Sequence, residues 1–178
     1  MKDDHVIVLD FFPHGKPNDR RSEPIAQCIG DMFFNLLEVV VREGVAVKTK
    51  DRVYIGNDKR EQVKYIRGKI SVKELTNFSR GILEEVVTEL VTNEEKRYVE
   101  FFNKAGPIST RMHTLELLYG IGKKHLWTII DERKKKLFES FQDIENRIPM
   151  IPNVKKVVVR RVLEELEGKD RHNLFVYA

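Results

Sequence analysis

Two glycines that flank one apolar residue, Gly120-Ile121-Gly122, interrupt an apolar stretch with helical spacing that runs from residue 115 to residue 130. Glycine alone enters the positive-φ region at little cost, so this pair predicts a turn too tight for side chains, with a helix on either side. Ile121 is expected to point inward and to lock the two helices together. The feature therefore predicts a helical hairpin in this part of the chain.

The start of the second helix is expected to bind an anion. Its first backbone N–H groups lack partners within the helix, and the positive end of the helix dipole lies there. Lys123 and Lys124 add full charges, and His125 is interpreted as a further phosphate donor or a surface histidine. A nucleic-acid phosphate fits this set of groups. The first candidate binding residues are Gly120, Ile121, Gly122, Lys123, Lys124 and His125.

A degenerate copy of this motif occupies residues 148–163, with apolar residues at matching positions. Asn153 stands in the place of Gly120, and asparagine tolerates a left-handed backbone better than most residues. Lys155 replaces Gly122, so the second turn is expected to approach a backbone less closely. Such a repeat suggests two hairpins about a pseudo-twofold axis, each facing one phosphate backbone. The second set of candidates is Asn153, Lys155, Lys156 and Arg160.

At these residues the chain resembles the helix-hairpin-helix family of nucleic-acid binders. The signature of that family is an apolar residue, any residue, Gly-apolar-Gly, three residues and then usually Ala; here Leu126 stands where Ala is common. The resemblance covers about residues 107–166, with repeats at about 107–136 and 140–167. It implies a grip on the phosphate backbone without base readout. The motif by itself leans toward duplex DNA.

The whole chain also resembles an uncharacterised archaeal protein family, with a small β-barrel ahead of such a helical region, for which RNA binding is only predicted. This resemblance implies a cytoplasmic nucleic-acid-binding protein, favours RNA, and supplies no reaction. The residues alone do not choose between RNA and DNA, or between single and double strands.

Cationic residues are concentrated in the proposed hairpins. The whole chain carries 32 Lys and Arg against 28 Asp and Glu, whereas residues 107–161 hold twelve against six. A local basic face is the expected footprint of a polyanion binder, although it can also be a solvated helical surface. The single cysteine, Cys28, excludes an intramolecular disulfide and favours a reducing compartment. No apolar run approaches the roughly 20 residues of a membrane helix, so no membrane partner is expected.

Residues 1–70 are expected to form a small β-barrel domain, OB-like or SH3-like. The interpretation treats residues 25–34 as a strand or a short helix and residues 13–24 as a long exposed loop. Tyr54 and Tyr65, beside cationic neighbours, are compatible with base stacking, but half-buried strand aromatics more often belong to a core. The five expected strands are residues 5–12, 36–41, 45–49, 52–55 and 63–67.

Residues 71–178 are expected to form an all-α domain, which makes the fold class α+β. Ser71 and Glu74 form a capping-box pattern that marks the change to helices. Apolar residues then recur at helical spacing in residues 82–91 and 98–102, as a structural core. Trp127 is expected to pack on Ile130 rather than to stack on a base.

The favoured function is a non-enzymatic nucleic-acid-binding protein. A protein-interaction module with a partner in a translation, transcription or ribonucleoprotein assembly is the alternative. Some base-excision glycosylases also contain this hairpin and a downstream catalytic Asp, here matched by Asp143. Ser140 and Asp143, however, form a helix-capping pattern that explains the carboxylate without chemistry. Neither metal-ligand spacing nor a phosphate-binding Gly-Lys loop occurs, so no cofactor is expected.

Overall fold

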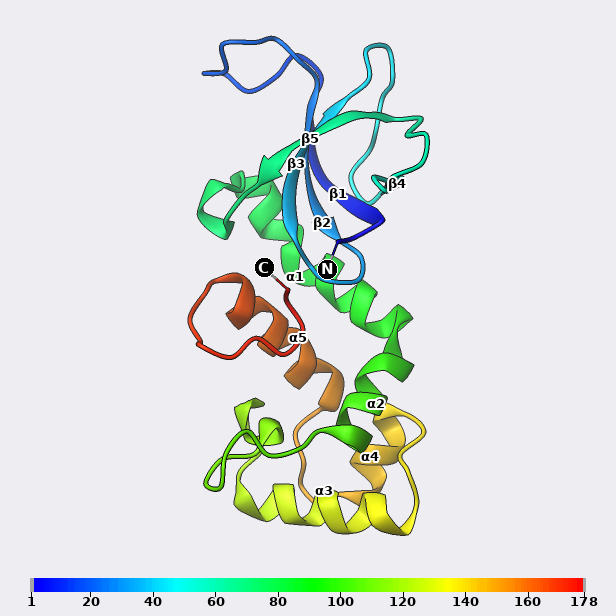
Figure 1. Cartoon of the computed structure of the whole chain (residues 1–178), viewed down its shortest axis with the longest axis vertical. Helices are drawn as coiled ribbons and strands as arrows, with labels where there is room; N and C mark the ends of the chain where they lie inside the picture. The colour runs from blue at the N-terminus through cyan, green and yellow to red at the C-terminus, as the bar shows by residue number, and fades with distance from the viewer. Residues whose placement is uncertain (1, 178) are drawn as a thin grey trace. The chain divides into compact units, whose positions relative to one another are not determined.

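The computed structural model describes residues 2–177 and divides into two compact units (Figure 1). The first unit contains the described residues up to Val86 and those from Glu164 onward, and the second is Val87–Leu163. Two helices, α1 (Asn77–Asn93) and α5 (Val154–Leu166), have residues in both units. Among the described residues, no helix combines the length and the apolar character needed to span a membrane.

The first unit contains a curled, antiparallel, five-stranded sheet of order β4-β1-β2-β3-β5. In the part of the chain that is described, β4 and β5 are edge strands with no pairing between them. The sheet is therefore a curled half-barrel, and the small OB-like or SH3-like barrel expected from the sequence is confirmed only to this extent. The strands are β1 (His5–Phe12), β2 (Ile25–Gly30), β3 (Leu36–Val41), β4 (Arg52–Tyr54) and β5 (Val63–Lys69).

Residues 45–49 do not form the expected strand. Val47 is buried in the sheet core, so its apolar character reflects packing rather than ladder pairing. The Lys48 N–H donates to the Asp51 carboxylate at 2.8 Å, which folds the segment into a turn before β4. Residues 25–30, left open between strand and helix, form the central strand β2, and residues 13–24 form the expected loop.

Both faces of the central strands are buried, because every residue of β2 and β3 is buried. On one face, Gln27 accepts hydrogen bonds from the Thr76 N–H at 2.9 Å and from the Ser79 hydroxyl at 3.0 Å, which places the start of α1 over this face. On the other face lies an apolar core. It comprises Val6, Val8, Ala26, Cys28, Leu37, Val39, Val41, Val47, Val53, Ile55 and Val63.

Two successive caps begin the helical region. Glu74 accepts the Ser71 N–H at 2.7 Å, so the predicted capping box is present, but it starts only a short 3-10 turn, η1 (Val72–Glu74). The Thr76 hydroxyl then accepts the Ser79 N–H at 3.0 Å at the start of α1. The expected cap thus lies one turn before the long helix that it was expected to start.

The C-terminal segment after α5 is organised by a buried carboxylate. Glu165, only 3% exposed, accepts the backbone N–H groups of Leu174 at 2.7 Å and of Phe175 and Val176 at 2.9 Å each. Three such donors stabilise a carboxylate that would otherwise be costly to bury. These bonds turn the segment back in the first unit, where the Tyr177 N–H donates to the Phe33 carbonyl.

In the second unit, α2 (Glu95–Lys104), α3 (Lys123–Lys135) and α4 (Phe141–Arg147) follow α1 along the chain. Arginines close two helix ends. Arg133 donates to the carbonyls of Phe102 and Ala105, at the end of α2, at 3.0 and 2.9 Å. Arg147 donates to two carbonyls at the end of α3 at 2.7 Å each. Both guanidinium groups bind carbonyls that a helix end leaves without partners.

Candidate nucleic-acid interface

The first predicted turn is present, but its two glycines have different roles. Gly120 has φ +75°, and a Cβ built on it would lie 2.7 Å from Pro152 Cγ, so both backbone and space favour glycine. Gly122 is extended, with φ −95°, and is the N-cap of α3. The expectation that both glycines serve a left-handed turn is therefore wrong for Gly122. Ile121 between them is buried, as expected.

The structure before this turn is shorter than predicted. In place of an apolar helix there is a 3-10 turn, η2 (Thr114–Leu117). His113 Nδ1 accepts the Leu115 N–H at 3.1 Å, and Glu116 accepts the His113 N–H at 2.8 Å. His113 is also bridged to Pro107 in antiparallel pairing, which closes a short loop directly before η2. The first turn therefore joins a 3-10 turn to α3, and the helix predicted before it is absent from the described residues.

The start of α3 is open to an anion. Gly122 has no side chain to cap it, and the first helical bond runs from the Leu126 N–H to the Gly122 carbonyl at 2.9 Å. Among residues 2–177, no acceptor is described for the backbone N–H groups of Lys123 and Lys124. These groups and the helix dipole leave a positive potential at this end.

The three side chains that follow Gly122 differ in whether other groups of the protein already bind them. Lys123 forms an ion pair with Glu116 at 2.9 Å, so part of its charge is neutralised. Its ammonium and the His113 N–H hold the pKa of Glu116 below its ordinary value, with the N–H as the larger cause. His125 Nδ1 lies 3.1 Å from the Gly120 carbonyl and braces the turn. Lys124 is exposed, and within the described chain no ion pair engages it.

At the second turn, side chains of the protein itself accept the N–H groups at the start of α5. Asn153 does not take the left-handed conformation predicted for it, which Met150 takes instead with φ +59°. Asn153 caps α5, because its side-chain oxygen accepts the Lys156 N–H at 3.0 Å. Glu145 accepts the Val154 N–H at 2.8 Å, so a carboxylate already lies at the start of α5. In structural terms Asn153 corresponds to Gly122, not to Gly120.

The remaining candidates of the second motif lie near the start of α5. Lys155 is half-buried and Lys156 is exposed. The guanidinium carbon of Arg160 lies 3.5 Å from the centroid of the Tyr119 ring, a cation–π contact rather than an unengaged phosphate ligand. The two turns nevertheless meet, since Arg161, 3% exposed, donates to the Leu117 carbonyl at 3.2 Å.

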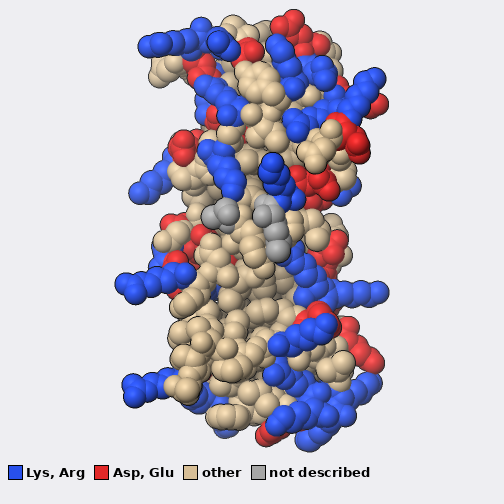
Figure 2. Space-filling view, viewed as in Figure 1, with Lys and Arg blue, Asp and Glu red and all other residues tan. Residues whose placement is uncertain are grey.

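Trp127 is 60% exposed, so the expectation that it packs on Ile130 is wrong. Leu126 and Ile129 take the buried positions of α3, which directs Trp127 to the opposite side. The helical phase of these residues was readable in the sequence and would have identified an outward indole. Figure 2 shows Lys and Arg gathering over the C-terminal end of the same helix.

Asp143, the residue matched to a glycosylase carboxylate, serves as a capping group. Its N–H donates to the Ser140 hydroxyl at 2.9 Å, which confirms Ser140 as the N-cap of α4. Its carboxylate accepts the Glu139 N–H at 3.0 Å and contacts Arg147 at 3.3 Å. Residues 2–177 contain no group of three or more His, Cys, Asp or Glu side chains arranged to hold a metal.

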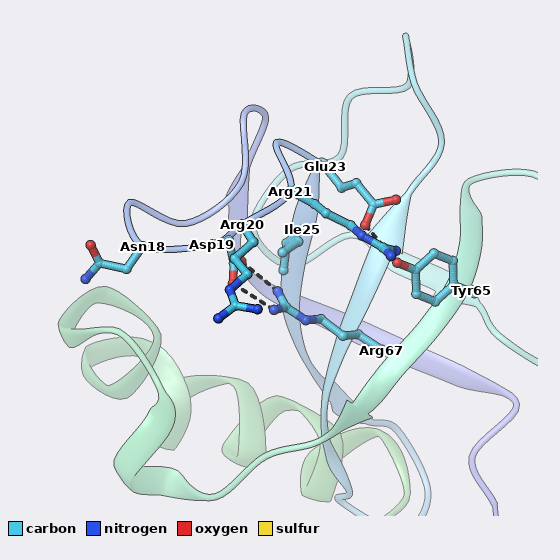
Figure 3. Close-up of a pocket in the computed structure, with 8 residues that line it drawn as sticks. All are labelled: Asn18, Asp19, Arg20, Arg21, Glu23, Ile25, Tyr65 and Arg67. Carbon is cyan, nitrogen blue, oxygen red and sulfur yellow. Dashed lines mark hydrogen bonds and ion pairs between the residues drawn. The ribbon is translucent and has the colours of Figure 1, made fainter.

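Of the aromatic residues predicted on the sheet, Tyr65 is engaged with the loop of residues 13–24, as is Arg67, whereas the Tyr54 hydroxyl accepts the Asp58 N–H at 3.1 Å. Arg67 forms a paired contact with Asp19, with both nitrogen–oxygen distances 2.7 Å (Figure 3). The Tyr65 hydroxyl donates to Glu23 at 2.8 Å, which raises the pKa of Tyr65. The pocket beside them, about 350 Å³, lies at the small end of ligand pockets. Since these charges are satisfied internally, we assign it no ligand.

Comparisons with known proteins agree over the whole chain. The family model described as "Protein of unknown function (DUF655)" matches residues 2–177. An uncharacterised protein from Methanocaldococcus jannaschii is 42% identical over 176 residues, which are 98% of this chain and 80% of that protein. A crystal structure of an Archaeoglobus fulgidus protein of the same family has a TM-score of 0.88 and 42% identity, and the match covers 98% of this chain and 100% of that one. The chain belongs to the archaeal DUF655 family of proteins of unknown function.

Proposed function

We propose that this protein binds nucleic acid, RNA in the first instance, by holding a backbone phosphate at the start of α3. The observation that carries the proposal is the contrast between two helix starts. The start of α5 holds the carboxylate of Glu145, whereas the start of α3 has a glycine N-cap, unengaged N–H groups and the exposed Lys124 beside it. A phosphate diester carries the same charge as the carboxylate and accepts the same bonds.

Each residue of the first turn has a place in this proposal. Gly122 lets a phosphate approach the backbone, because a Cβ there would meet nothing within 4 Å and no side chain fills the space. The N–H groups of Lys123 and Lys124 donate to the phosphate, and the Lys124 ammonium neutralises it. Such contacts fix position without reading bases, so sequence specificity is expected to be low.

The second turn has a supporting role in this proposal. Pro152 packs against Gly120, and Arg161 ties α5 to the segment before the first turn. Lys156 adds charge nearby, and Arg160 contributes through its contact with Tyr119. We regard the pair of turns as a degenerate tandem helix-hairpin-helix that grips on one side only. The half-barrel corresponds in this proposal to the OB-like part of the archaeal family resemblance, which also favours RNA over DNA.

The test is a salt series of affinities for labelled single-stranded RNA, duplex RNA and duplex DNA. Lys124→Glu is expected to weaken binding and to flatten the plot of log affinity against log salt by roughly one unit. Lys59→Glu is the matched control, because Lys59 is an exposed lysine in the first unit and the charge change is the same. Equal effects of the two variants, or affinity that does not respond to salt, would contradict the proposal and favour a protein partner.

A further inference from the structure

Trp127 is a large exposed aromatic beside the proposed phosphate site. It is the only tryptophan of the chain, and its 60% exposure is high for a residue type that is usually well buried. Leu126 and Ile129 fix the phase of α3 by their burial, so the indole does not turn inward. No structural role within the described residues accounts for an indole at this position.

The surroundings of Trp127 are cationic. Residues three, four and seven positions apart share one side of a helix, which places Lys124 one turn before Trp127 and Lys134 two turns after it. Both lysines are exposed, and within residues 2–177 no ion pair is described for either. Asp131, the one acidic neighbour on this side, lies between Trp127 and Lys134. An exposed indole one turn after Lys123 and Lys124 complements a ligand that is both anionic and aromatic.

The position of Trp127 suits one nucleotide. It lies four residues after Lys123, which is about 6 Å along the helix axis. A single nucleotide covers such a distance between its phosphate and its base. In a duplex the base faces are occupied by neighbouring bases, so only an unpaired base reaches an indole on a convex helix surface.

We infer that Trp127 is a stacking platform for an unpaired base whose phosphate is held at the start of α3, so that the ligand is single-stranded RNA. This inference rests on the proposed function and narrows its substrate class. A protein partner fits the same surface less well, because the centres of protein interfaces are depleted of charged residues, whereas Trp127 has Lys124 one turn before it and Asp131 one turn after it.

Because Trp127 is the only tryptophan of the chain, the tryptophan fluorescence of the wild-type protein reports on this residue alone. Intrinsic fluorescence is followed while the full chain is titrated with a short single-stranded RNA, with the duplex of the same length, and with inorganic polyphosphate. Single-stranded RNA is expected to quench the emission strongly. Polyphosphate, which supplies charge without bases, and the duplex are expected to bind with little quenching.

Variants separate stacking from charge. Trp127→Ala is expected to lower the affinity for single-stranded RNA roughly tenfold and to leave polyphosphate binding unchanged, while Trp127→Phe retains most of the affinity. Phe78→Ala, which removes another exposed aromatic from the first unit, is the control and is expected to change neither. Strong RNA binding without quenching and without loss in Trp127→Ala would overturn this inference but leave the proposed function intact. Absence of binding to both RNA and polyphosphate would overturn both.

Discussion

Replacement of Gly120 by alanine tests the account of the first turn directly. Gly120 has φ +75°, and its Cβ position lies 2.7 Å from Pro152 Cγ, whereas the Cβ position of Gly122 meets nothing within 4 Å. The two glycines are separated only by Ile121, so they form a matched pair. The structure predicts that Gly120→Ala destabilises the fold and that Gly122→Ala has little effect.

The expected size follows from two separate contributions. A left-handed backbone costs a non-glycine residue roughly 1–2 kcal/mol. Overpacking against Pro152 costs about 1–3 kcal/mol more, for a combined loss of about 2–5 kcal/mol in the free energy of unfolding. Neither contribution applies at Gly122, where alanine is a poorer N-cap than glycine and the exchange costs about 0.5–1 kcal/mol.

The assay is urea unfolding followed by far-UV circular dichroism, with the slope m checked for constancy among variants. A double-mutant cycle with Pro152→Ala isolates the contact. In that background Gly120→Ala should lose only the backbone contribution, which gives a coupling energy of about 1–3 kcal/mol. Equal losses for Gly120→Ala and Gly122→Ala, or no coupling to Pro152→Ala, would refute the reasoning.

Two further predictions concern a buried carboxylate and a buried imidazole. Glu165→Gln places an amide group among three N–H donors and should lower the free energy of unfolding by about 2–4 kcal/mol in the same urea assay. A loss no greater than that of the exposed control Glu167→Gln would contradict this prediction. Burial, and secondarily the charge of Arg133, holds the pKa of His113 below its ordinary value of 6.5. Below pH 6.5 the unfolded chain then binds more protons than the folded chain, so the free energy of unfolding should fall as the pH drops from 6.5 through the pKa of folded His113. His113→Asn should flatten this pH dependence of the urea midpoint. An unchanged pH dependence would exclude His113 as its source.

The parts of the fold that the sequence predicted are those set by short-range rules. The Ser140 cap depends on a partner three residues away, and the turn at Gly120 depends on the conformation of one residue. Four of the expected strands follow from runs of β-branched and aromatic residues. Residues 45–49 have a similar composition, but they form no strand. Val47 is buried in the sheet core without pairing to a neighbouring strand.

The candidate site was less predictable because its decisive contacts are not local. Glu145 lies nine residues before Val154, and nothing in the motif indicates that its carboxylate occupies the start of α5. The alignment of Asn153 with Gly120 followed the apolar spacing, yet the helix begins two residues earlier than that alignment implies. The cation–π contact of Arg160 likewise depends on how α5 meets the first turn.

The start of α5, which is occupied by a carboxylate of the protein, provides a test of the role of the start of α3. Two helix starts that derive from similar sequence motifs meet at Gly120 and Pro152, and in one of them the chain supplies its own carboxylate. If helix starts of this kind needed no anion, Glu145→Gln would leave α5 as stable as before. If they do, α3 is the start whose anion the chain does not provide, and loss of the Glu145 charge should give α5 a second, salt-dependent site for polyphosphate. An increase in polyphosphate bound per chain in Glu145→Gln, reversed by Lys156→Glu, would support an external phosphate as the missing partner of α3.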